Sequence, residues 1–73
     1  MLKLFVEDYK NGYMDVYTNV YQVKIAKHNN KNCLEVHYRL NPLKDTDIIP
    51  LSEIKLCWLI NADTLEEYFR YEK

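Results

Sequence analysis

The chain has 73 residues, ten of them basic and eleven acidic, which gives a net charge of −1. This length leaves room for one domain, residues 1–73. The charges are spread along the chain without a basic block, which argues against strong electrostatic binding to nucleic acid. The chain contains one glycine, so a glycine-rich phosphate-binding loop is excluded.

The sequence carries no sign of export or membrane insertion. The longest apolar run, Leu56–Ile60, has five residues, whereas a membrane helix needs ~20. The apolar start, Met1–Val6, runs directly into two acidic residues, unlike an export signal. We therefore expect a cytoplasmic protein in which Cys33 and Cys57 are buried, reduced thiols. A single Cys33–Cys57 bridge is the less favoured alternative.

Apolar residues alternate with polar ones along most of the chain, which predicts strands. The first strand is expected at Leu2–Tyr9, and Asn11-Gly12 is a strong hairpin signal because both residues tolerate positive φ. A three-residue loop with Gly12 in the left-handed position pairs Val6 with Val16. We favour this register over that of a two-residue loop because it collects the aliphatic side chains on one face.

The apolar phase changes near Thr18-Asn19, which predicts a bulge or bend more than a tight turn. A second hairpin is predicted between Tyr21–Lys27 and Cys33–Leu40, where apolar matching and charge matching agree on one register. That register pairs Lys27 with Asn32, Ile25 with Leu34, Lys24 with Glu35, Val23 with Val36 and Tyr21 with Tyr38. The strand then ends at Asn41-Pro42.

The remaining chain predicts two strands and a helix. Pro50 within Ile48–Leu51 indicates an edge strand or a bulge, followed by a kink at Ser52-Glu53. The last strand is expected at Ile54–Ile60, with Leu56, Trp58 and Ile60 on the face opposite Cys57 and Leu59. The predicted helix near residues 64–71 rests on an Asp63–Glu66 capping box, an apolar stripe and a Glu66–Arg70 pair. The stripe consists of Leu65, Tyr68 and Phe69.

These elements indicate a mainly β (α+β) fold. About five antiparallel strands would form a small bent sheet or a partly open SH3-like or OB-like barrel, with one short C-terminal helix. An isolated helix of this length is unstable in water, so its stripe must dock on the sheet or on a partner.

No catalytic, cofactor or metal site emerges from the residue pattern. Cys33, Glu35 and His37 alternate on one strand face, but Cys33 and His37 would lie ~13 Å apart, too far to share an ion. The histidines, His28 and His37, have no nucleophile that the sequence places beside them. We therefore expect a protein that is not an enzyme and needs no cofactor.

Aromatic residues recur every four positions at Phe5, Tyr9, Tyr13 and Tyr17, which in the favoured register share the face opposite the aliphatic one. One interpretation is that the C-terminal helix covers this face. The other is that the face is an exposed patch that binds a partner, because tyrosine provides a large, rigid side chain with a polar tip.

The leading hypothesis is a small non-enzymatic protein-interaction domain that binds a host protein or a second copy of itself. The bias towards Asn, Lys and Tyr fits an AT-rich genome, such as that of a phage or mobile element. The alternative is a single-stranded nucleic-acid-binding barrel that stacks bases on its aromatic residues. The acidic residues near the tyrosines disfavour this alternative, and no association with membranes is expected.

Overall fold

The computed structural model describes residues 1–10, 12–38 and 46–72. Its elements are β1 (Leu2–Asp8), β2 (Met14–His28), β3 (Lys31–Tyr38), β4 (Asp47–Pro50), the 3-10 turn η1 (Leu51–Glu53), β5 (Ile54–Asn61) and β6 (Glu67–Glu72). The six strands form one antiparallel sheet in the order β4-β3-β2-β1-β5-β6, and the sheet is not closed. The prediction of a mainly β, antiparallel fold is confirmed.

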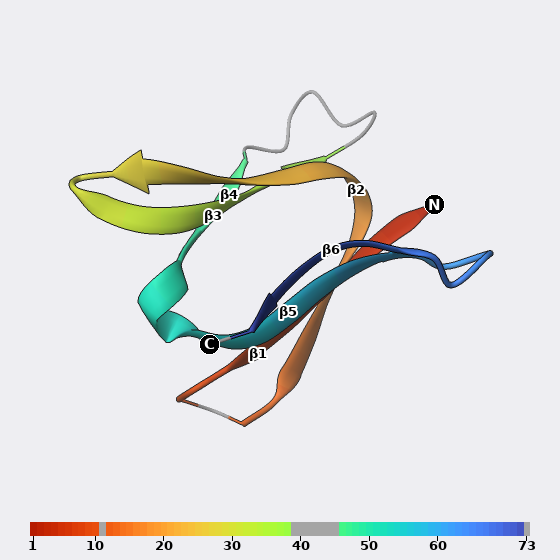
Figure 1. Ribbon diagram of the computed structural model, residues 1–73, viewed down its shortest axis with the longest axis horizontal. Coiled ribbons are helices and arrows are strands. Elements are labelled where there is room, and N and C mark those ends of the chain that lie inside the picture. Colours follow the sequence, from red (N-terminus) through yellow and green to blue (C-terminus); the bar gives the residue numbers. More distant parts are fainter. Residues whose placement is uncertain (11, 39–45, 73) are drawn as a thin grey trace.

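The sheet folds over on itself because its longest strand bends. The first part of β2 pairs with β1 in one layer, and its last part pairs with β3 in the other (Figure 1). Asn19 at the bend has a φ of 58°, and the β1–β2 register shifts between Leu2 and Leu4. A bulge adds one residue and bends the strand, so the predicted bulge near Thr18-Asn19 is confirmed.

The core lies between the two layers and draws on both of them. The first layer contributes Leu4, Val6, Cys57 and Leu59, together with Ile54 at the start of β5. The second layer contributes Leu34 and Val36, and Val20 lies at the bend of β2 between the layers. Cys33 and Cys57 are both buried and free, and burial raises the pKa of the Cys57 thiol to about 11.

The first hairpin forms as predicted, but its register differs from the expected one. Gly12 is left-handed with a φ of 68°, whereas Asn11 lies outside the described residues. Phe5 pairs with Val16 and Val6 with Asp15, so the predicted Val6–Val16 pairing is wrong by one residue. A shift of one residue turns each side chain to the other face.

The second hairpin matches its predicted register along most of its length. Lys27 pairs with Asn32, Ile25 with Leu34, Val23 with Val36 and Lys24 with Glu35. The predicted Tyr21–Tyr38 pair is wrong, because a register shift after Val20 sets Val20 opposite Tyr38. The two-residue turn Asn29-Asn30 has positive φ at both positions, which suits the twist of a tight hairpin.

The elements around Pro50 agree with the sequence. β4, which ends at Pro50, forms one edge of the sheet, and η1 supplies the kink predicted at Ser52-Glu53. The predicted strand end at Asn41-Pro42 lies outside the described residues.

The predicted C-terminal helix near residues 64–71 is wrong, because the segment forms β6 instead. Asn61 directs a tight turn: its side-chain oxygen accepts hydrogen bonds from the backbone N–H groups of Asp63 and Thr64, at 2.8 and 3.2 Å. Leu65 adopts a φ of 65°, which a helix does not allow. The chain therefore reverses and pairs with β5, placing Phe69 opposite Leu59. A helix of about eight residues is unstable without support, so pairing with β5 stabilises this segment more than helix formation would.

Candidate functional site

The structure separates the four aromatic residues that the sequence placed on one face. Phe5 points away from the core, whereas Tyr17 lies opposite Leu4 and packs against the core. Tyr9, directly after β1, is 53% exposed, and Tyr13, directly before β2, is 73% exposed. The one-residue change of register explains the separation, and without a helix the predicted helical cover does not exist.

Cross-strand pairing defines the surface on which Phe5 lies. Residues directly opposite one another share a face of the sheet. Phe5 is opposite both Val16 and Trp58, and Trp58 is opposite Arg70, which makes one row across four strands. The neighbouring rows add Met14, Leu56 and Ile60 through their pairing with Glu7 and Lys3. We call the set Met14, Val16, Phe5, Leu56, Trp58 and Ile60 the outer aromatic face.

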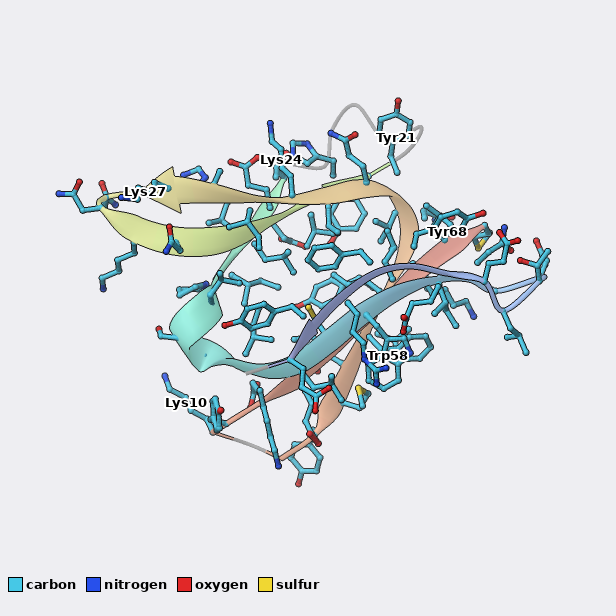
Figure 2. All side chains as sticks on the ribbon, viewed as in Figure 1. Lys10, Tyr21, Lys24, Lys27, Trp58 and Tyr68 are labelled. Atoms are coloured by element: carbon cyan, nitrogen blue, oxygen red, sulfur yellow. The ribbon has the colours of Figure 1, made fainter. Side chains whose placement is uncertain are left out.

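The centre of the outer aromatic face is a stack of three side chains. The Phe5 and Trp58 rings stack with centroids 5.8 Å apart, and the Arg70 guanidinium lies 5.7 Å from the centroid of Trp58. Figure 2 shows Trp58 pointing away from the layer that carries Lys24. Val16 and Met14 beside the stack are 48% and 42% exposed. The face thus presents a rigid aromatic centre next to exposed aliphatic groups.

Charges at the edge of this face largely neutralise one another. Lys55 lies 3.9 Å from Glu7, and Arg70 lies 3.8 Å from Glu67 and 3.9 Å from Glu72. Such exposed pairs contribute little stability. Their importance here is that Lys55 and Arg70 already have carboxylate partners, whereas Lys3, opposite Ile60, is a further cation on this face.

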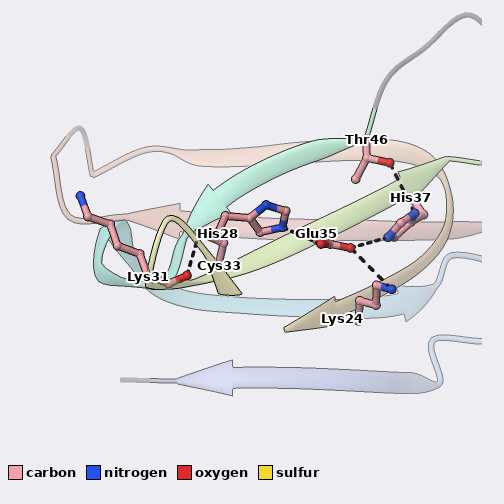
Figure 3. Close-up of polar contacts among 7 residues, drawn as sticks. All are labelled: Lys24, His28, Lys31, Cys33, Glu35, His37 and Thr46. Atoms are coloured by element: carbon pink, nitrogen blue, oxygen red, sulfur yellow. Dashed lines mark hydrogen bonds and ion pairs between the residues drawn. The ribbon is translucent and has the colours of Figure 1, made fainter. Parts of the chain in front are cut away.

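The outer surface of the other layer is polar and is organised around Glu35 (Figure 3). Its carboxylate lies 2.6 Å from His28 Nε2, 3.0 Å from His37 Nε2 and 3.7 Å from Lys24 Nζ. Thr46 Oγ1 lies 3.4 Å from His37 Nδ1. The register of the second hairpin positions this cluster, because Lys24 is opposite Glu35 and His28 ends β2 beside the start of β3.

We call Glu35, His28, His37 and Lys24 the Glu35 cluster, and we compared it with what a metal site or a catalytic site requires. Hydrogen bonds with His28 and then His37 lower the pKa of Glu35. Among the described residues, no group of three or more His, Cys, Asp or Glu side chains is arranged to hold a metal ion. The Thr46–His37 contact, at 3.4 Å, is longer than a good hydrogen bond to a nucleophile. The cluster therefore ties β2, β3 and the start of β4 together.

A second polar group lies near the bend of β2. The Tyr38 hydroxyl donates a hydrogen bond to Asp47, and burial together with this carboxylate raises the pKa of Tyr38. Burial, followed by repulsion from Asp15, Asp47 and Asp8, raises the pKa of Tyr17. The electrostatic surroundings of Tyr17 are therefore negative.

Comparisons with known proteins give no relative: no family model, curated protein or solved structure matches this chain. Among the described residues, no helix is long and apolar enough to span a membrane.

Sequence reasoning placed Phe5 among the site residues but missed Trp58, Val16 and Arg70. The signal for Trp58 was present, since the alternation in Ile54–Asn61 separates Trp58 from Cys57 and Leu59. Alternation alone does not tell which face is the core. Arg70 was missed because a strand was interpreted as a helix.

Proposed function

We propose that this protein is a small, non-enzymatic protein-interaction domain that binds a partner through the outer aromatic face. The observation that carries this proposal is the row Val16–Phe5–Trp58–Arg70, in which a half-buried aromatic pair lies beside exposed Val16 and Met14 on the outer side of the sheet. Contiguous apolar surface of this kind commonly marks an interaction site. Trp, Phe, Met and Arg are also enriched at protein interfaces relative to the remaining surface.

The stack makes the face suitable for tight contact. A side chain that is already held in place loses little conformational freedom on binding, and Phe5 and Arg70 both restrict the Trp58 ring. Aromatic residues at the centre of an interface concentrate binding energy, while the surrounding polar rim excludes water. Lys55, Glu67 and Glu72 supply such a rim, and Glu7 lies within the face between Met14 and Leu56, with its charge paired to Lys55.

Charge favours a protein partner over single-stranded nucleic acid. Nucleic-acid platforms combine aromatic residues with cations that are free to contact phosphates. Here Arg70 and Lys55 are paired with carboxylates, and Lys3, opposite Ile60, is the further cation among the described residues of this face. Binding of single-stranded DNA or RNA at physiological salt should therefore be no tighter than ~10⁻⁴ M. Sub-micromolar binding in a fluorescence anisotropy titration with an oligonucleotide would favour the nucleic-acid alternative instead.

The cellular setting is proposed from composition alone. The richness in Asn, Lys and Tyr fits an AT-rich genome. We place the protein among the small cytoplasmic accessory proteins of a phage or mobile element, with a host protein as its partner.

The experiment is a comparative pull-down from host lysate, followed by affinity measurement with the purified partner. Val16→Lys places a charge on the outer aromatic face, and Ile48→Lys is the matched control on the other layer. The two side chains are 48% and 47% exposed, and Ile48 pairs with Glu35, beside which a lysine is tolerated. Val16→Lys should weaken binding at least ~30-fold, as expected near an interface centre. Equal effects of both variants, or none, would contradict the proposal.

A further inference from the structure

The open sheet has two edges, and they differ in how well they can accept another strand. β4 ends at Pro50, which has no N–H, and runs directly into η1. β6 has six residues and no proline. Backbone groups along the free edge of a terminal strand are a template for pairing with another chain. β6 is therefore the better candidate for strand addition.

Only one half of β6 is regular. Its register against β5 shifts between Leu59 and Ile60, so a bulge disturbs the first half of the strand. Bulges at sheet edges twist the edge and prevent pairing. From Phe69 to Glu72 the strand pairs regularly with Leu56–Leu59. Among the described strands none pairs with the outer edge of this regular half, so it is the part suited to an added strand.

A groove lies beside this same half of β6. It has a volume of about 410 Å³ and is lined by Tyr71 of β6, Leu51 and Ser52 of η1, and Lys31 and Asn32 of β3. Figure 1 shows η1 near the C-terminal end of β6. Among these lining residues Lys31 is a cation and none is a carboxylate, and the carboxylate of Glu72 on the adjoining edge is paired with Arg70. The groove therefore combines an aromatic wall, an apolar residue and a positive charge.

We propose that the Phe69–Glu72 edge and this groove bind an extended, acidic segment of a partner protein by strand addition. Main-chain hydrogen bonds to β6 provide affinity, and pockets for alternate side chains provide specificity in this mode of recognition. An inward-facing side chain of the added strand enters the groove beside Tyr71, and its carboxylate pairs with Lys31. This surface is separate from the outer aromatic face and does not depend on the function proposed for that face.

The test is selection of a random twelve-residue peptide library, displayed on phage, against the full chain. The expected result is a consensus in which Asp or Glu is flanked at alternate positions by β-branched or aromatic residues. The synthetic consensus peptide should then lose at least tenfold in affinity for Lys31→Glu, and replacing its acid with Lys should restore binding to that variant. Lys3→Glu, on the outer aromatic face and away from the groove, is the control and should change the affinity less than threefold.

Three outcomes would overturn the proposal. The first is that no consensus is enriched, and the second is that Lys31→Glu and Lys3→Glu lower the affinity equally. The third is that binding survives both when the odd-numbered backbone amides of the peptide are N-methylated and when the even-numbered ones are. The last outcome would show that β6 does not pair with the peptide backbone. Val16→Lys separates the two surfaces, because it should leave the affinity of the peptide unchanged. Loss of the peptide on Val16→Lys would instead assign it to the outer aromatic face.

Discussion

The two outer surfaces of the folded sheet differ in the contacts that their side chains make within the chain. On the β2–β3–β4 layer, the Glu35 carboxylate contacts His28, His37 and Lys24, so its polar groups find partners within the chain. On the β2–β1–β5–β6 layer, Phe5 and Trp58 stack on each other, and aliphatic side chains beside them remain exposed. The charged groups of the first surface are paired with one another although Ile48 beside them is exposed, whereas the second surface groups its exposed aliphatic side chains around an aromatic stack that a partner could cover.

This contrast is the reason for assigning function to the aromatic surface and not to the histidine cluster. Two histidines around a carboxylate are easily interpreted as a catalytic or metal site, but in this structure their hydrogen bonds to Glu35 link neighbouring strands. A row of apolar side chains is less readily interpreted as a binding surface, because alternating apolar residues in a strand are usually assigned to the core. The four predictions below test the contrast, from the largest expected effect to the smallest.

The largest effect should be the same beneath both surfaces, because they share one core. Leu4 underlies the aromatic layer and Leu34 the polar layer, and both are completely buried. Replacing either with Ala should lower the free energy of unfolding by ~2–5 kcal/mol. A domain of this size has little more than ~3–5 kcal/mol in total, so urea melts should show either variant largely unfolded. A mild loss for one of them would show that the layers do not share a core.

Trp58→Ala should separate binding from stability. Because the ring is half-buried, its removal should cost about 1–3 kcal/mol, less than a fully buried aromatic residue. The variant should stay folded by circular dichroism while partner binding is lost. Global unfolding of Trp58→Ala would mean that the ring is a structural element, and Val16→Lys would then be the deciding variant for function.

The tyrosines that the sequence grouped together should respond differently to the same change. Tyr17 packs against the core, so Tyr17→Ser should cost about 1–3 kcal/mol of stability. Tyr13 is 73% exposed, so Tyr13→Ser should change stability by less than about 0.5 kcal/mol. Parallel urea melts compare the two, and similar losses would argue against the observed register of the first hairpin.

The smallest effect concerns the polar surface and depends on pH. Hydrogen bonds to His28 and His37 lower the pKa of Glu35 below its ordinary value of 4.5. Ionised Glu35 therefore contributes stability above that value, and the contribution is lost as the pH falls through the lowered pKa of the folded state. The stability difference between wild type and Glu35→Gln should shrink when urea melts are repeated from pH 5 down to pH 3. A difference that grows over this range would contradict the assignment.

The two hairpins show how far register can be predicted. In the second hairpin, apolar pairs and the Lys24–Glu35 charge pair required the same alignment, and the prediction was correct apart from Tyr21. In the first hairpin, collecting aliphatic residues on one face was the only criterion, and it assumed that Met14 and Val16 are core residues. Both are exposed on the outer aromatic face. Apolar side chains on an outer face therefore mislead a prediction that treats each apolar residue as core.

The tail was predicted wrongly for a related reason. Leu65, Tyr68 and Phe69 have helical spacing, but this spacing says nothing about the free edge of β5, which becomes available only when the sheet has formed. Asn61 and the left-handed Leu65 reverse the chain, and Phe69 then packs against the core.

By itself, the sequence determined that the chain is mainly β and antiparallel, that β2 bends near Asn19, and how the second hairpin pairs along most of its length. These features follow from local preferences and from nearest-neighbour pairing along the strands. Only the tertiary structure decided which face of each strand is buried, that the tail is a sixth strand, and that Phe5, Trp58 and Arg70 meet on one surface. Those outcomes depend on contacts between strands that are far apart in the chain, and period-two alternation is the same for either face.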